Sequence, residues 1–255
     1  MIFETHAHYD DAAFDADREE LLASLPEHGI GRVINVCASV ESLDRIGAML
    51  DRWPHVYGAV GVHPDEVGGM NEAVMEKIRM LCRHEKVLAV GEIGLDYHWN
   101  VESHETQGEW FKRQLELARE EGLPVSIHSR EAAADTLKIA KEMDLGGIGG
   151  VLHCYSYSKE LAKEYLDMGM YLGIGGVVTF KNAKRLKEVV AYAPLDRLLL
   201  ETDCPYMAPE PYRGKRNSSL YLSYVANRIG QLKGVSPEEV IRVTEENAKR
   251  LFLHL

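Results

Sequence analysis

The chain has 255 residues, of which 45% are hydrophobic, and it carries a formal net charge of −11. This length suits one α/β domain spanning 1–255 and is short for two domains joined by a linker. The negative charge excludes a broad basic surface that would hold nucleic acid unaided, because non-specific binding depends on many Lys and Arg contacts to phosphate.

Short apolar runs recur along the chain and predict eight strands. They lie at residues 1–5, 32–37, 56–62, 87–93, 124–127, 148–152, 171–174 and 197–201. Helical patterns separate these runs. In one of them Phe111, Leu115 and Ala118 repeat at helical spacing before Gly122 and Pro124 end the segment.

The last predicted element is a helix that begins after Ser236 and runs to about Leu253. The segment Ser-Pro-Glu-Glu predicts a capping box, with Ser236 at the N-cap and Glu239 reaching back to it. Eight strand and helix units in one domain predict a single (β/α)8 TIM barrel. An open doubly wound sheet usually has fewer strands, and it has a glycine-rich phosphate turn after the first strand that this chain lacks.

Signals for secretion or membrane insertion are missing from the sequence. No basic stretch followed by an apolar run opens the chain, and no apolar segment approaches the length of a membrane span. The four cysteines are far apart and show no Cys-x-x-Cys spacing, which is typical of reduced thiols. We therefore expect a cytoplasmic protein with no membrane association and no obligate protein partner.

Candidate metal ligands follow several of the apolar runs. They are His6, His8, Glu92, His128, His153 and Asp203. In a βα barrel the C-terminal ends of the strands meet at one face, so these side chains are expected to form one site there. His6 and His8 are two apart and share a face of their strand, although a His-x-His pair alone is a modest signal. Mixed imidazole and carboxylate donors suit Zn or Mn, and Mg if water completes its shell.

The number of candidate ligands favours two divalent ions over one. A single catalytic Zn usually takes three protein ligands, whereas six ligands can hold two ions that share a carboxylate, for which Glu92 is the natural choice. Two ions would activate a water molecule and stabilise the leaving oxygen, which is chemistry that suits phosphodiesters. Asp203 could also accept the proton of the attacking water.

Four further polar residues are candidates for contact with substrate, namely His63, Asp96, Arg130 and Glu201. His63 could donate to a phosphate oxygen, but a structural histidine that caps a loop is about equally plausible. Arg130 lies two residues after His128 and is a candidate substrate ligand. Glu201 could orient a ligand or act directly.

A basic loop follows the eighth predicted strand and contains Arg213, Lys215 and Arg216. Loops after the last strands of a βα barrel often bind phosphate, and Arg can engage phosphate through two hydrogen bonds. The alternative is a solvated surface loop. The place of the basic loop beside Asp203 favours contact with substrate.

These residues resemble those of TatD-type metal-dependent deoxyribonucleases, a family within the amidohydrolase-like barrels. The resemblance spans essentially the whole chain and rests on Thr5-His6-Ala7-His8, Gly61-Val62-His63-Pro64, Gly91-Glu92-Ile93-Gly94-Leu95-Asp96-Tyr97, His128-Ser129-Arg130, Leu152-His153-Cys154, Glu201-Thr202-Asp203 and Arg213-Gly214-Lys215-Arg216-Asn217. It implies that His6, His8, Glu92 and Asp203 surround one ion, and that Glu92, His128 and His153 surround the other. Tyr157 departs from the usual family pattern and could narrow the mouth of the site or stack on a base.

The function expected from these features is metal-dependent cleavage of DNA, with exonuclease action on single-stranded ends implied by the resemblance. One alternative is a hydrolase of a small amide, lactone or phosphate ester, because the same centre serves many chemistries on this fold. The acidic composition slightly favours that alternative. A metal-holding barrel that only binds a partner is the third possibility, but a full ligand set and a candidate base argue against it.

Overall fold

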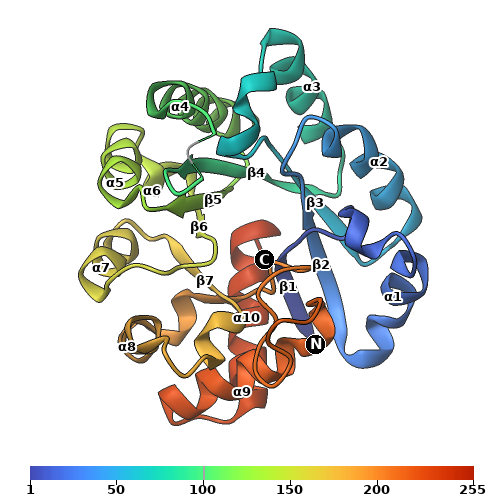
Figure 1. Ribbon diagram of the computed structural model, residues 1–255, viewed down its shortest axis with the longest axis vertical. Coiled ribbons are helices and arrows are strands. Elements are labelled where there is room, and N and C mark those ends of the chain that lie inside the picture. The colour runs from blue at the N-terminus through green and yellow to red at the C-terminus, as the bar shows by residue number, and fades with distance from the viewer. Residues whose placement is uncertain (100) are drawn as a thin grey trace.

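A computed structural model describes residues 1–99 and 101–255. It contains one parallel sheet in which the strands follow chain order from β1 to β8. The strands are β1 Ile2–Ala7, β2 Ile30–Val36, β3 Val56–Val60, β4 Val87–Asp96, β5 Val125–Arg130, β6 Gly150–Leu152, β7 Tyr171–Ile174 and β8 Leu198–Leu200. Figure 1 shows them as a ring surrounded by helices.

The ring closes where the chain continues past β8 and meets β1. Ala7 and Cys204 form a parallel bridge, and the backbone nitrogen of His8 donates to the carbonyl of Cys204 at 2.8 Å. The backbone nitrogen of Asp203 donates to the carbonyl of His6 at 2.9 Å. These contacts give a near-closed barrel, so the predicted TIM-barrel fold is confirmed.

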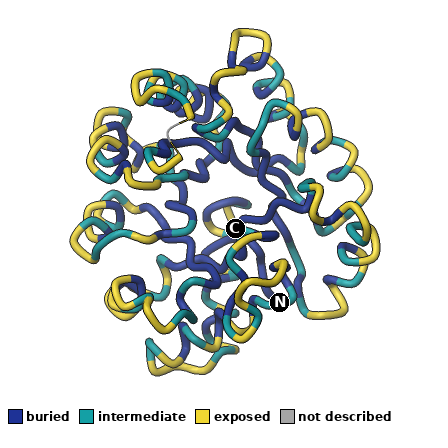
Figure 2. The backbone as a smooth tube through the Cα atoms, in the orientation of Figure 1, coloured by how far each residue is buried: buried dark blue, intermediate teal, exposed yellow. Residues whose placement is uncertain are grey.

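Ten α-helices lie among the described residues, and most of them cover the outside of the barrel (Figure 1). They are α1 Arg18–Ser24, α2 Ser42–Arg52, α3 Glu72–Cys82, α4 His104–Glu121, α5 Ala133–Glu142, α6 Leu145–Ile148, α7 Lys159–Asp167, α8 Lys184–Tyr192, α9 Leu222–Lys233 and α10 Pro237–Phe252. Most strand residues are buried, whereas the outer faces of the helices are exposed (Figure 2). No helix of the described chain is both long and apolar enough to cross a membrane.

The core has two parts. The larger cluster of buried side chains lies between the sheet and the surrounding helices. A smaller cluster combines strand residues such as Phe3, Leu88 and Leu199 with Leu251 and Phe252 of α10. Because its strand residues come from opposite sides of the ring, this cluster fills the barrel and α10 covers one end of it.

β4 and β5 each extend three residues beyond the end that the sequence predicts. β4 was expected to end at Ile93 and β5 at Ile127, but polar segments after both points stay extended because they pair with each other. Gly94 pairs with His128, and Asp96 pairs with Arg130. Glu92 and His128 therefore lie within strands, and the backbone of both residues is held on the sheet.

The predicted ends of two helices are confirmed with one difference. Gly122, with φ of 69°, ends α4 in the left-handed conformation that favours glycine. At the start of α10 the Ser236 hydroxyl accepts from the backbone nitrogen of Glu239 at 3.2 Å, as an N-cap should. The Glu239 carboxylate does not complete the box, because it accepts instead from the Arg242 guanidinium at 2.6 and 2.9 Å.

Candidate metal centre

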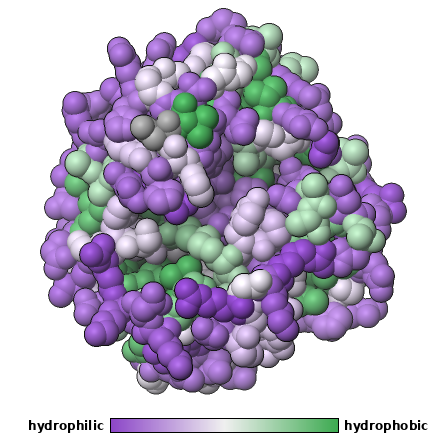
Figure 3. All heavy atoms as spheres, viewed as in Figure 1, coloured by the Kyte–Doolittle hydropathy of each residue, from purple (hydrophilic) through white to green (hydrophobic). Residues whose placement is uncertain are grey.

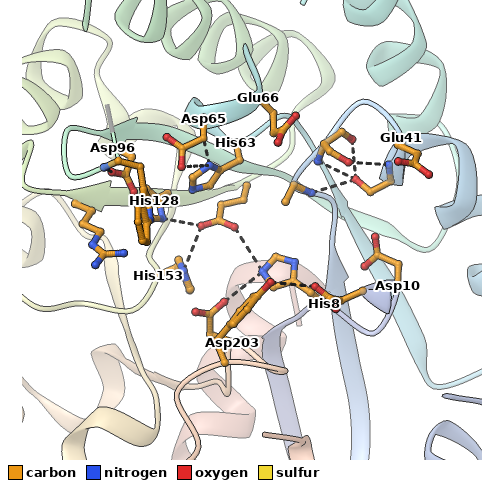
Figure 4. A pocket seen from close by; sticks show the side chains of 18 of the residues that line it. His8, Asp10, Glu41, His63, Asp65, Glu66, Asp96, His128, His153 and Asp203 are labelled. Carbon is orange, nitrogen blue, oxygen red and sulfur yellow. Dashed lines mark hydrogen bonds and ion pairs between the residues drawn. The ribbon is translucent and has the colours of Figure 1, made fainter. Parts of the chain in front are cut away.

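A cavity of about 640 Å³ opens at the C-terminal ends of the strands. The space-filling view shows a hydrophilic hollow near the middle of this face (Figure 3). Its lining includes five of the six predicted ligands, His8, Glu92, His128, His153 and Asp203, together with His63. The labelled side chains His8, His128, His153 and Asp203 converge from separate parts of the ring (Figure 4).

Glu92 lies at the centre of the site and is almost fully buried. Its Oε2 is 3.4 Å from His6 Nε2 and 3.6 Å from His8 Nε2. Its Oε1 is 2.9 Å from His128 Nδ1 and 3.3 Å from His153 Nε2. Each oxygen of one carboxylate thus faces a different pair of imidazoles.

Asp203 adds a second carboxylate to the pair formed by His6 and His8. Its Oδ1 is 3.2 Å from His8 Nε2 and 3.9 Å from His6 Nε2, while the two Nε2 atoms are 3.2 Å apart. Donor atoms bound tetrahedrally to Zn at about 2.0–2.1 Å are about 3.4 Å from one another. The donor atoms therefore have the spacing that a single divalent ion requires.

Hydrogen bonding sets the orientation of the two histidines on β1. His8 Nδ1 lies 2.8 Å from the carbonyl oxygen of Val36, which can only accept, so Nδ1 carries the hydrogen. Nε2 of His8 then faces Glu92 and Asp203. His6 Nδ1 lies 3.1 Å from the hydroxyl of Ser126, which holds the ring in place.

Charge at the site favours a cation. Burial of His8 opposes its protonation, but the hydrogen bond and charge of Asp203, with the charge of Glu92, raise the pKa of His8 to about 9. Further carboxylates line the cavity, whereas its only lining Lys or Arg residues within the described chain are Arg45 and Arg130. This surplus of negative charge stabilises a proton on the His8 imidazole, and a divalent ion would neutralise the same charge in place of that proton.

The second pair of histidines has its own carboxylate partners. His128 Nε2 lies 2.9 Å from Asp96 Oδ2. His153 Nδ1 is 3.4 Å from Glu201 Oε1. Gly173 on β7 makes room for Glu201, since a Cβ at that glycine would lie 2.2 Å from Glu201 Oε2. The predicted second set, Glu92, His128 and His153, is thus brought together.

His63 lies beside this second set. Its Nδ1 accepts from the backbone nitrogen of Asp65 at 3.2 Å, and its ring centre is 4.3 Å from that of His128. Burial, together with the charge of His128, lowers the pKa of His63 to about 4, so the ring is neutral at pH 7. Because Nδ1 accepts, Nε2 carries the hydrogen and is a donor.

Of the four basic residues predicted to bind substrate, only Arg130 lines the cavity. Arg213 lies 4.3 Å from the centre of the Phe180 ring, and Lys215 lies 5.8 Å from that of Tyr212. The Arg216 guanidinium binds both oxygens of Asp17, at 2.7 and 2.5 Å. The structure does not bring the basic loop into the cavity lining.

Tyr157, which was expected at the mouth of the site, supports a neighbouring loop. Its hydroxyl lies 3.0 Å from the Ser129 hydroxyl and accepts from the backbone nitrogen of Ala132 at 3.1 Å. The ring thus holds the segment between β5 and α5.

Sequence analysis missed four buried polar residues that hold the backbone around the site. They are Glu4, Gln107, Gln114 and Asn217. Both glutamines pair their amides with a strand end: Gln107 with the nitrogen and oxygen of Asp96, and Gln114 with those of Val62. A signal was present, because Gln107 and Gln114 are seven residues apart on the apolar face of α4.

The other two missed residues hold the chain after β8. The Glu4 carboxylate accepts from the backbone nitrogens of His6 and Thr202 at 3.1 and 2.9 Å. The Asn217 amide donates to the carbonyls of Thr202 and Tyr206 at 3.0 and 2.7 Å. Glu4 and Asn217 therefore fix the backbone before Asp203, at Thr202, and after it, at Tyr206.

A profile of the TatD related DNase family matches residues 3–253. The chain belongs to this family. Among related proteins, the uncharacterized metal-dependent hydrolase YabD of Bacillus subtilis is 44% identical over 252 residues, with 99% of each chain covered. The 3′-5′ ssDNA/RNA exonuclease TatD of Cronobacter sakazakii is 34% identical over 246 residues, with 94% of this chain and 93% of that protein covered.

Solved structures agree with this membership. The TatD homologue YjjV of Escherichia coli superposes with a TM-score of 0.93 at 31% identity, covering 99% of this chain and 98% of that one. A lactonase of Listeria monocytogenes has a TM-score of 0.68 at 12% identity, covers 98% of this chain and 94% of that one, and so shares the fold alone. The predicted resemblance is confirmed, and this TatD-family protein is a metal-dependent hydrolase.

Proposed function

We propose that the protein hydrolyses DNA phosphodiester bonds from the end of a single strand, using two divalent ions of Mg, Mn or Zn. His6, His8, Glu92 and Asp203 would hold one ion, and Glu92, His128 and His153 would hold the other. The observation that carries this proposal is the placement of the Glu92 carboxylate, whose two oxygens face two separate pairs of imidazole nitrogens.

The ions, when bound, supply Lewis acidity that activates water and stabilises negative charge on phosphate oxygens. Asp203 is the candidate proton acceptor, since its carboxylate both faces His8 and lines the cavity. His63 presents its Nε2 hydrogen beside Glu92 and His128, where it can donate to a phosphate oxygen. Arg130 contributes a fixed positive charge at the rim.

The charge of the cavity supports a terminal, single-stranded substrate. Long nucleic acids bind through many phosphate contacts, but this lining offers Arg45 and Arg130 against eight carboxylates: Asp10, Asp11, Glu41, Asp65, Glu66, Glu92, Asp96 and Asp203. A single phosphodiester at the end of a strand can reach the ions without bringing a long, negatively charged backbone against these carboxylates. The Cronobacter relative is named as an exonuclease of single-stranded DNA and RNA, which supports this substrate class.

The direct test is digestion of end-labelled single-stranded DNA by metal-stripped protein supplied with Mg, Mn or Zn. We expect stepwise shortening from one end, slower action on a blunt duplex, and no shortening by Glu92→Ala. A parallel RNA strand shows whether the sugar is discriminated. Internal cleavage of a circular strand at the same rate would contradict action at ends.

A second candidate, hydrolysis of a small amide, lactone or phosphate ester, is favoured by one observation. The basic loop of Arg213, Lys215 and Arg216 is absent from the cavity lining, which leaves little positive charge for a polymer. If the metal-loaded enzyme cleaves small esters or lactones but leaves every DNA substrate intact, this function replaces the first.

A further inference from the structure

We infer that Trp99 and Arg130 form a subsite for the nucleotide at the attacked end, in which Arg130 pairs with a phosphate and Trp99 stacks on the base. The inference rests on the proposed nuclease function and names what recognises its substrate. Both side chains line the cavity that contains the candidate metal ligands.

Trp99 is unusual because a large aromatic side chain at the rim of a polar cavity is left in water. It is 62% exposed. The Arg130 guanidinium lies 5.4 Å from the centre of its ring, within the range of a cation–π contact. An exposed ring beside a fixed positive charge offers the two features, a stacking surface and a phosphate partner, that single-stranded nucleic acid requires.

The local backbone fixes this pair relative to the metal ligands. The backbone nitrogen of Trp99 donates to Asp96 Oδ1 at 3.0 Å, and the other oxygen of Asp96 lies 2.9 Å from His128 Nε2. Arg130 pairs with Asp96 in the sheet and is two residues beyond His128. Trp99 is thus linked to His128 through the Asp96 carboxylate, and Arg130 lies two residues beyond His128 on β5. We place the nucleotide that adjoins the metal ligands against this pair.

The chemistry of stacking defines the ligand class. Every base presents a π-face, so stacking on Trp99 tolerates all sequences, as processing of an end requires. A base inside a duplex has its faces covered by its neighbours, so the subsite requires an end whose last base is unstacked. The subsite also distinguishes a nucleotide, which has a base to stack on Trp99, from a bare sugar phosphate, which has none.

The test compares two single-stranded oligonucleotides that differ only at the end that the enzyme attacks, where one has a base and the other a tetrahydrofuran abasic residue. kcat/KM is measured for metal-loaded wild type, Trp99→Ala and Trp99→Phe. Tyr192→Ala is the matched control, because Tyr192 is also exposed and lies 5.8 Å from a cation, Lys159, but does not line the cavity.

We expect wild type to prefer the base-containing end by about 5- to 150-fold, the range of one base–aromatic stack. Trp99→Ala should lose this preference and keep its rate on the abasic end, Trp99→Phe should retain part of it, and Tyr192→Ala should match wild type. Equal loss on both substrates, or no loss on either, would overturn the inference while leaving the nuclease function standing. Failure of wild type to cleave either strand would contradict the proposed function and the subsite with it.

Discussion

At the scale of single residues, the candidate site is defined by imidazole nitrogens and carboxylate oxygens that face one another around Glu92. His8 Nδ1 is engaged by the Val36 carbonyl, so its Nε2 faces Glu92 and Asp203. The sequence predicts these ligands because imidazole and carboxylate groups stand out among apolar runs. It does not predict their partners, such as Val36 and Ser126, because a carbonyl or hydroxyl in a strand has no distinctive pattern.

Asp203→Asn separates catalysis from metal binding. The amide keeps the shape and one oxygen of the side chain but cannot accept a proton, so kcat should fall by about 10²- to 10⁴-fold. Metal content should remain at least half that of wild type, since Glu92 and the histidines are intact. Elemental analysis with single-turnover kinetics checks both, and the exposed Asp196→Asn serves as control. An unchanged kcat would remove Asp203 as the proton acceptor.

At the scale of elements, pairing between chain segments decides what local pattern cannot. The polar ends of β4 and β5 remain strands because Gly94 to Asp96 pair with His128 to Arg130. In the basic loop, a tertiary contact works against the expectation from sequence, because Arg216 binds Asp17, which is 199 residues earlier in the chain. This tertiary contact engages the Arg216 side chain outside the cavity lining, and its sequence position near Asp203 gave no indication of it.

Asn217→Ala tests how the loop after β8 is held. The change removes two donated hydrogen bonds and leaves the carbonyls of Thr202 and Tyr206 without this partner, which costs about 1–3 kcal/mol of unfolding free energy for each buried group left unpaired. Tm should fall by about 2–4 °C for every kcal/mol lost. Calorimetry measures this, with the exposed Asn182→Ala as control. Equal Tm values for the two variants would show that the loop is held by other contacts.

At the scale of the whole molecule, the alternation of apolar runs and helical segments was sufficient to predict a barrel. Eight runs in one domain have few other arrangements, and the ring is closed by contacts between Ala7 at the end of β1 and Cys204 after β8. Binding of the two expected ions also depends on the whole fold, because their ligands come from the ends of five strands, β1, β4, β5, β6 and β8.

Removal of metal should therefore lower stability throughout the molecule. Ligands that bind only the folded state at 100 times their Kd add about 2.7 kcal/mol, so chelation should lower Tm by about 5–10 °C. Addition of Zn or Mn should restore it, and Glu92→Ala should show a smaller difference between stripped and loaded protein. Identical melting curves for stripped and reloaded wild type would show that the cluster holds no stabilising ion.

The most direct test of the account is a metal titration of stripped protein in which bound metal and cleavage of single-stranded DNA are followed together, for wild type and Glu92→Gln. If Glu92 joins two ions in one catalytic centre, cleavage by wild type should rise only as the second ion binds, and Glu92→Gln should bind less metal and remain inactive. Full cleavage with a single ion, or two bound ions and an unchanged rate in Glu92→Gln, would contradict it.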